Sequence, residues 1–108
     1  MFDCVLPTRI ARHSCAMTSH GRMILKNKEF EKDFTPLDPE SDCFVDRVYT
    51  KAYLRHLFVS DELLAMQIAS IHNLAFYLRL VKMARQHIID GDFSTWKAEM
   101  VKKLSVRL

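Results

Sequence analysis

A carboxylate and two guanidinium groups lie close together near the start of this chain, in the order Asp3, Arg9 and Arg12. The alternation of apolar side chains over residues 2–6 predicts the end of a buried strand, and Pro7 then opens a loop because proline cannot continue a hydrogen-bonded ladder. Asp3 would therefore lie at the carboxyl end of a strand, where α/β proteins gather their ligands. The segment combines a carboxylate suited to nucleophilic chemistry with arginines suited to phosphate.

Charge and composition restrict the function only slightly. The 108 residues carry a net charge of +3, with 49% hydrophobic and 27% charged side chains, which is ordinary for one small domain. Basic residues are spread among acidic ones over the whole chain, so charge alone indicates a solvated surface rather than a block that neutralises phosphates. The best candidate basic patch consists of Arg9, Arg12, His13, Arg22, Lys26 and Lys28.

Cysteine usage and hydropathy indicate the compartment. Cys4, Cys15 and Cys43 are an odd number without the spacing of a disulfide framework, and no signal peptide precedes them. We therefore expect a reduced, cytoplasmic protein. Polar residues interrupt the most apolar region, so no segment reaches the roughly 20 apolar residues that span a bilayer, and we expect no membrane insertion.

The hydrophobic spacing predicts a mostly helical chain. Apolar residues recur at intervals of three and four from Ser60, an expected N-cap, to Asp90, where Gly91 supplies the stop. At about 1.5 Å per residue this helix would be roughly 45 Å long, so it bends or packs against material outside this chain. The other expected elements are a strand at 23–25, an irregular segment at 28–48, and helices at 49–58 and 94–106.

The first nine residues, MFDCVLPTR, resemble the nucleophile segment of the tRNA-guanine transglycosylases, which exchange a guanine in tRNA for queuine or its precursor. Further segments are similar to the same family, in the same order and with matching gaps. They are residues 34–40 (FTPLDPE), 52–57 (AYLRHL) and 71–77 (IHNLAFY). The resemblance covers the whole chain, although members of the family are usually much longer TIM-type barrels.

The resemblance implies an α/β fold, the C-terminal portion of a TIM-type (β/α)8 barrel with a zinc-subdomain-like insertion, mostly helical in this chain. It divides the chain into residues 1–27 with end-of-barrel strands and an RNA-contact loop, residues 28–72 as a degenerate zinc-binding subdomain, and residues 60–108 as C-terminal helices. A lone strand and long apolar helices would leave surfaces that further chain or another subunit must cover.

The resemblance also assigns the chemistry. Asp3 corresponds to the catalytic nucleophile, which displaces the base from C1′ and holds the ribose as a covalent ester, as in a retaining glycosidase. Ile10 offers no hydrogen bond where relatives commonly have a small polar residue. No second carboxylate of this chain stands out as the general acid/base. The segment of the family that contacts tRNA corresponds to Thr8, Arg9, Ile10, Ala11 and Arg12.

The zinc site of the family is a Cys-x-Cys-x-x-Cys motif followed by a histidine, a ligand set that suits tetrahedral zinc. The corresponding residues here are Ser41, Cys43, Asp46 and His72. Two interpretations are open. One is a weakened zinc site formed by Cys43, Asp46, His72 and water. The other is a subdomain without metal, which must replace on the order of 10 kcal/mol of folding free energy by packing.

Two main functions follow from these observations. The first is a transglycosylase, a glycosyltransferase acting on tRNA and on queuine or its precursor base, of which this chain is a fragment. The alternative is a non-catalytic, diverged or truncated relative that acts as a partner subunit, because members of the family form dimers; a homodimer or a heterodimer with a family subunit is expected. A third interpretation is the product of a decaying gene that has no function.

Overall fold

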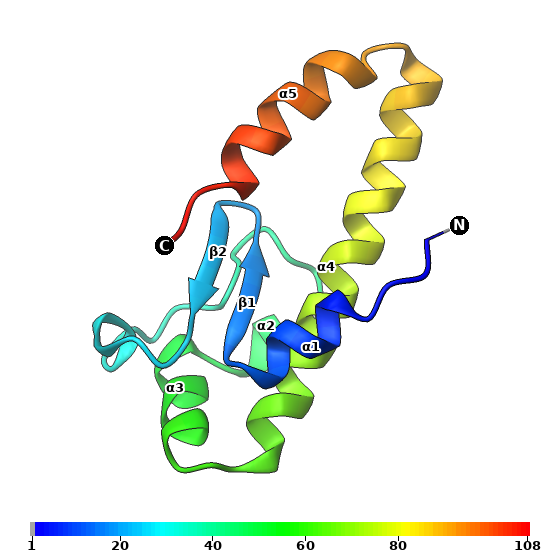
Figure 1. Cartoon of the computed structure of the whole chain (residues 1–108). Helices are drawn as coiled ribbons and strands as arrows, with labels where there is room; N and C mark the ends of the chain where they lie inside the picture. The colour runs from blue at the N-terminus through cyan, green and yellow to red at the C-terminus, as the bar shows by residue number, and fades with distance from the viewer. Residues whose placement is uncertain (1) are drawn as a thin grey trace.

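The structure is a computed structural model that describes residues 2–108. A two-stranded hairpin lies beside a long helix, and the shorter helices pack around both (Figure 1). The helices are α1 (Leu6–Arg12), α2 (Phe44–Val48), α3 (Lys51–Val59), α4 (Leu63–Asp90) and α5 (Phe93–Leu104), and the strands are β1 (Cys15–Thr18) and β2 (Gly21–Ile24).

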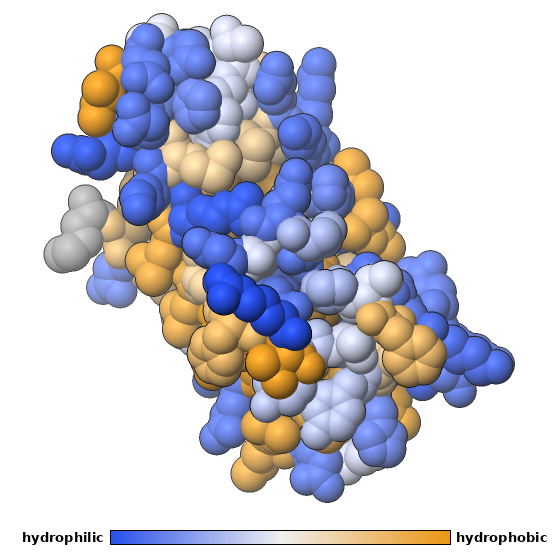
Figure 2. Space-filling view, turned by 180° about the vertical axis from the view of Figure 1, so that it is seen from behind, coloured by the Kyte–Doolittle hydropathy of each residue, from blue (hydrophilic) through white to orange (hydrophobic). Residues whose placement is uncertain are grey.

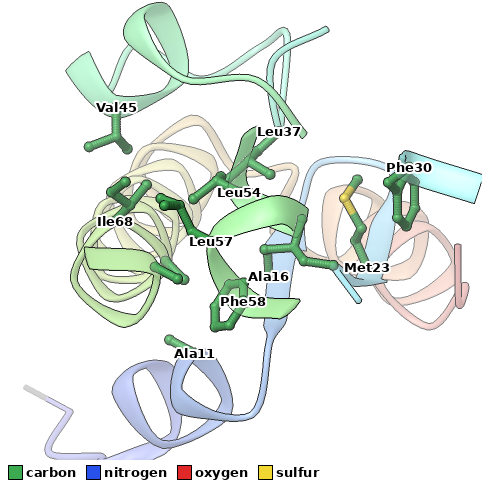
Figure 3. Packing of buried hydrophobic residues seen from close by; sticks show 13 residues of the cluster. Ala11, Ala16, Met23, Phe30, Leu37, Val45, Leu54, Leu57, Phe58 and Ile68 are labelled. Carbon is green, nitrogen blue, oxygen red and sulfur yellow. The ribbon is translucent and has the colours of Figure 1, made fainter. Parts of the chain in front are cut away.

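The hydrophobic core lies between the hairpin, α3 and the N-terminal half of α4 (Figure 3). The buried residues of α4 follow one another at intervals of one and three, from Ala65 to Phe76, so one face of the helix points inward. The core side chains include Ala11, Ala16, Met23, Leu25, Phe30, Leu37, Val45, Leu54, Leu57, Phe58, Ala65, Ile68 and Ala69.

The N-terminal strand predicted over residues 2–6 is wrong. Residues 2–4 have no regular secondary structure and are exposed, and α1 begins at Leu6. Pro7 occupies the first turn of α1, where its missing N–H costs no intrahelical hydrogen bond and its fixed φ favours the helix. The segment from Thr8 to Arg12 is consequently helical, not the expected loop.

The hairpin was only partly predicted. The strand expected at 23–25 is β2, which begins at Gly21, while β1 was missed because both faces of CAMT are largely buried and show no alternation. The strands are antiparallel with Thr18 opposite Gly21. The sheet within residues 2–108 contains these two strands, so the described chain is mostly helical and forms no barrel by itself.

The expected helices exist with shifted ends. Glu62, not Ser60, is the N-cap of α4, because Ser60 ends α3 and Asp61 adopts a positive φ of 56° between them. Gly91 ends α4 in the left-handed conformation, as predicted. The segment expected to be irregular at 28–48 contains a short 3-10 turn and α2, and α5 covers residues 93–104.

Helix α4 runs far beyond the core, and α5 folds back from its end toward the hairpin (Figure 1). The molecule measures 46 × 26 × 21 Å, in agreement with the expectation that so long a helix exceeds a compact domain. By length and composition α4 is also able to cross a membrane, with 33% of its most apolar window buried. Because the core helix of a globular protein passes the same test, the absence of membrane insertion stays a prediction.

Replacing Gly21 with alanine is expected to destabilise the protein by about 2 kcal/mol or more. Gly21 has a φ of +134°, and an added Cβ would collide with the carbonyl oxygen of Val106. The collision would push away the C-terminal segment, which pairs with β2 through Arg22 N–H donating to Val106 (2.8 Å) and Leu108 N–H donating to Arg22 (2.7 Å).

The matched control is Gly91→Ala, measured by urea denaturation beside the first variant. Gly91 also has a positive φ, of +83°, but nothing lies within 4 Å of the added Cβ. We expect this variant to lose only about 1 kcal/mol, the cost of a left-handed alanine. Equal losses in the two variants would contradict the steric role of Gly21.

Candidate functional site

The predicted chemical residues lie on the surface at the N-terminal end of the chain. Asp3 is exposed and, within residues 2–108, makes no hydrogen bond or ion pair. Arg9 and Arg12 are also exposed, and their spacing of three puts them on one side of α1. The carboxylate and both guanidinium groups are thus available to a ligand from solvent.

The other three residues of the expected RNA-contact segment are less available. The Thr8 hydroxyl donates a hydrogen bond to the carbonyl oxygen of Val5 at 3.1 Å, and Ile10 is half-buried. Ala11 is completely buried and packs in the core. The side chains of Arg9 and Arg12 therefore carry whatever polyanion contact this helix makes.

A buried asparagine fixes α1 and β1 to α4. Both hydrogens of the Asn73 amide nitrogen are used, because it donates to the carbonyl oxygens of Pro7 and Cys15, each at 3.0 Å. The amide oxygen accepts from the backbone N–H of Met17 at 3.0 Å. One side chain on α4 thereby sets the position of the helix that bears the two arginines.

An apolar groove of about 610 Å³ lies between the N-terminal segment and α4. Its lining includes Phe2 and Cys4, the neighbours of Asp3 in sequence, and side chains of α4 such as Leu74 and Leu78. Apolar surface runs along the flank of the molecule that bears this end of the chain (Figure 2). A contiguous exposed apolar surface of this kind indicates contact with further protein.

The expected metal ligands do not converge on a common point for an ion. His72 lies between Asp46 and the backbone of β1, with Nδ1 at 2.8 Å from Asp46 Oδ2 and Nε2 at 2.7 Å from the carbonyl oxygen of Met17. The Ser41 hydroxyl oxygen accepts from the backbone N–H of Cys43 at 3.2 Å. Cys43 is partly buried and packs against the hydrophobic core.

These contacts do not fit the zinc implied by the family. Both ring nitrogens of His72 already have oxygen partners, Nδ1 the Asp46 carboxylate and Nε2 the carbonyl oxygen of Met17. Burial alone would lower the pKa of His72, but the hydrogen bond and charge of Asp46 outweigh it and raise the pKa above 6.5. A zinc ligand needs a free ring nitrogen, and a single cysteine remains of the three thiolates.

A second group with ligand chemistry, His20, Asp38 and Glu40, has its ligand atoms within 4.8 Å of one another. Buried Asp38 is already occupied, because its carboxylate accepts from the Ser19 N–H at 2.8 Å, the Ser19 hydroxyl at 2.7 Å and the Glu40 N–H at 3.0 Å. Burial opposes ionisation, yet these bonds hold the pKa of Asp38 below 3.8. Asp38 therefore has a structural role: it ties the 34–40 segment to the hairpin turn.

Sequence reasoning missed two residues that position the site, Asn73 and Asp38. Both occur inside segments similar to the family, 71–77 and 34–40, and both are polar residues next to apolar ones. That pattern is the available signal, because a polar side chain inside an apolar stretch is buried only where it finds hydrogen-bond partners.

Comparison with known proteins gives one consistent relationship. The profile of the family described as "TGT: Queuine tRNA-ribosyltransferase" matches residues 1–106. A queuine tRNA-ribosyltransferase of Streptococcus pneumoniae (strain Hungary19A-6) is 52% identical over 103 residues, which is 95% of this chain and 27% of the relative. Proteins of the same name from strains CGSP14 and serotype 19F (G54) have the same identity and coverage.

The family profile covers nearly the whole chain. The chain belongs to the queuine tRNA-ribosyltransferase family, as its resemblance to the tRNA-guanine transglycosylases implies. It spans about a quarter of the length of the curated relatives that it matches.

Proposed function

We propose that this chain is the C-terminal part of a tRNA-guanine transglycosylase and supplies its nucleophile. The observation that carries the proposal is the exposure of Asp3, Arg9 and Arg12 together at one end of a chain that is 52% identical to queuine tRNA-ribosyltransferases. An exposed carboxylate and two exposed guanidiniums within one short N-terminal segment suit a reaction at a sugar that is flanked by phosphates.

In the proposed reaction the Asp3 carboxylate attacks C1′ of the target nucleotide while the bond to guanine breaks. The departing guanine takes a proton from a general acid, and the ribose remains attached to Asp3 as an ester. Queuine or its precursor then displaces Asp3 from C1′ and loses a proton to the same group. Arg9 and Arg12 bind the tRNA phosphates and hold the nucleotide in place.

The remaining parts of the reaction come from outside these residues. We propose that the general acid/base and the pocket for the incoming base belong to further polypeptide, since this chain covers 27% of its relatives. In the complete enzyme, residues 1–27 would form the end of a TIM-type barrel together with that further polypeptide. Met1, the first of these residues, lies outside the described part of the chain. The three free cysteines are in keeping with a cytoplasmic setting. No step of the exchange passes through the degenerate zinc position.

The test is covalent trapping on the protein in its native form. Incubated with substrate tRNA and separated on a denaturing gel, the protein is expected to form an adduct, and it is expected to incorporate labelled guanine into the tRNA. Asp3→Ala should abolish the adduct and slow the exchange by at least about 10³-fold, because the nucleophile acts as a unit with the rest of the site.

Asp42→Ala is the matched control, because Asp42 is another exposed carboxylate of the same chain. It should form the adduct at the rate of the unchanged protein. An adduct that persists in Asp3→Ala, or native protein that never forms one, would overturn the proposed role of Asp3.

The apolar groove favours one second function, that of a non-catalytic partner subunit. Leu74 and Leu78 on α4 are 45% and 73% exposed, which indicates a surface suited to contact with another protein chain. In that case the chain forms a homodimer or a heterodimer with a longer member of the family, and Asp3→Ala leaves the activity of the complex unchanged. The mass of the native polypeptide, together with the Asp3→Ala result, separates this function from the first.

A further inference from the structure

We propose that a metal-free centre, the buried His72–Asp46 ion pair, holds the subdomain together at the position where the family resemblance implies zinc. The pair connects three elements that are far apart in sequence. His72 belongs to α4, Asp46 to α2, and the Met17 carbonyl that accepts the second ring hydrogen belongs to β1. This inference is independent of the proposed catalytic function.

The first argument is that the centre is complete without an ion. Asp46 uses both carboxylate oxygens, Oδ2 toward His72 at 2.8 Å and Oδ1 as acceptor of the Asp38 N–H at 3.3 Å. Within residues 2–108, no buried side-chain nitrogen or oxygen lacks a hydrogen-bond partner. A pocket shaped for a cation would instead leave several acceptors without donors.

The second argument is the burial of both side chains. His72 and Asp46 are 1% and 3% exposed, so an uncompensated charge on either would be costly. The His72 ring nitrogen Nδ1 and the Asp46 carboxylate oxygen Oδ2 lie 2.8 Å apart, so each buried polar group is the partner of the other. A zinc ion at this place would have to displace the Asp46 carboxylate from His72 Nδ1, the ring nitrogen that does not face the Met17 carbonyl oxygen.

The third argument concerns the two remaining positions. The backbone N–H of Cys43 donates a hydrogen bond to the Ser41 hydroxyl oxygen at 3.2 Å, which closes a local turn ahead of α2. Cys43 packs against the core as a small apolar residue. The hydrogen bond between Asp46 and His72 instead joins α2 directly to α4.

The experiment measures metal content and its effect on stability in the purified protein. We expect less than about 0.1 zinc per chain by mass spectrometry of the metal, and a thermal unfolding midpoint that changes by less than about 1 °C with EDTA or zinc chloride. One zinc per chain, or a midpoint that falls with EDTA, would overturn the proposal.

A double variant, Ser41→Cys with Asp46→Cys, supplies the matched comparison. It removes the carboxylate that occupies His72 and creates three thiols with one imidazole, the ligand set that zinc prefers. We expect it to take up about one zinc per chain and to unfold at lower temperature when EDTA is added. If the variant is unfolded without metal, recovery of its helical circular dichroism on zinc addition is the same result. A variant that acquires no zinc would refute the claim that the ion pair stands at the metal position.

Discussion

Replacement of Asp46 with alanine is expected to lower the free energy of unfolding by about 3–5 kcal/mol, because it leaves His72 buried without its partner. The loss is large beside the 5–15 kcal/mol or so that stabilises a typical domain. The variant would also free the backbone N–H of Asp38, which donates to Asp46 Oδ1. Urea denaturation followed by circular dichroism measures the change.

A second histidine–aspartate pair in the same chain provides the control. His87 Nδ1 lies 2.8 Å from Asp92 Oδ1, the same distance from Nδ1 to a carboxylate oxygen as in the buried pair, but the Asp92 side chain is 56% exposed. Asp92→Ala should therefore cost at most about 1 kcal/mol, since water screens exposed ion pairs. Similar losses in the two alanine variants would mean that burial of the His72–Asp46 pair contributes nothing.

Asn73→Leu is the second substitution with a large expected effect, a loss of about 3 kcal/mol or more. Leucine has a similar size but leaves the carbonyl oxygens of Pro7 and Cys15 and the N–H of Met17 without their partner. Each unsatisfied buried group costs about 1–3 kcal/mol. Because Asn73 ties α1 to α4, the variant should also loosen the helix that bears Arg9.

Gln67→Leu is the comparison for this substitution. Gln67 lies on the same helix, is exposed, and makes no side-chain hydrogen bond within the described residues. Its replacement should change the free energy of unfolding by less than about 0.5 kcal/mol. Amide hydrogen exchange of α1 in both variants tests the second claim, and unaltered protection of α1 in Asn73→Leu would refute it.

The helices of this chain were the most predictable part of the fold. The repeat of apolar residues at three and four places determines α4, and Gly91 ends it as expected because glycine alone adopts the left-handed conformation without strain. The start of α4 was misplaced because Ser60 and Asp61 are typical of an N-cap. In the structure they form the turn that ends α3.

The N-terminal segment was mispredicted because local alternation cannot reveal a missing partner strand. Residues 2–6 alternate like a strand, but within residues 2–108 no strand lies beside them, and a lone strand has no ladder to stabilise it. Pro7, interpreted as the opening of a loop, instead starts a helix. The same residue type is typical of both places, so the sequence alone leaves them undecided.

The candidate site was predictable in its residues but not in its contacts. The family resemblance singled out His72 and Asp46 as candidate metal ligands, and the structure brings these two together at 2.8 Å. The spacing of these residues in the sequence does not predict the third partner of this contact, the carbonyl oxygen of Met17 in β1. A backbone acceptor has no sequence signature, yet it occupies the second ring nitrogen of His72.

The molecule has two regions that differ in how tightly they are packed. One is the core, and the other is a helical arm formed by the distal half of α4 and by α5. None of the residues of α5 is buried, whereas the proximal half of α4 supplies six buried side chains. Thermal fluctuation can therefore detach the arm while the ion-pair region stays intact. Proteolysis and local opening would concentrate where α4 meets α5, around Gly91, and leave the buried His72–Asp46 pair undisturbed.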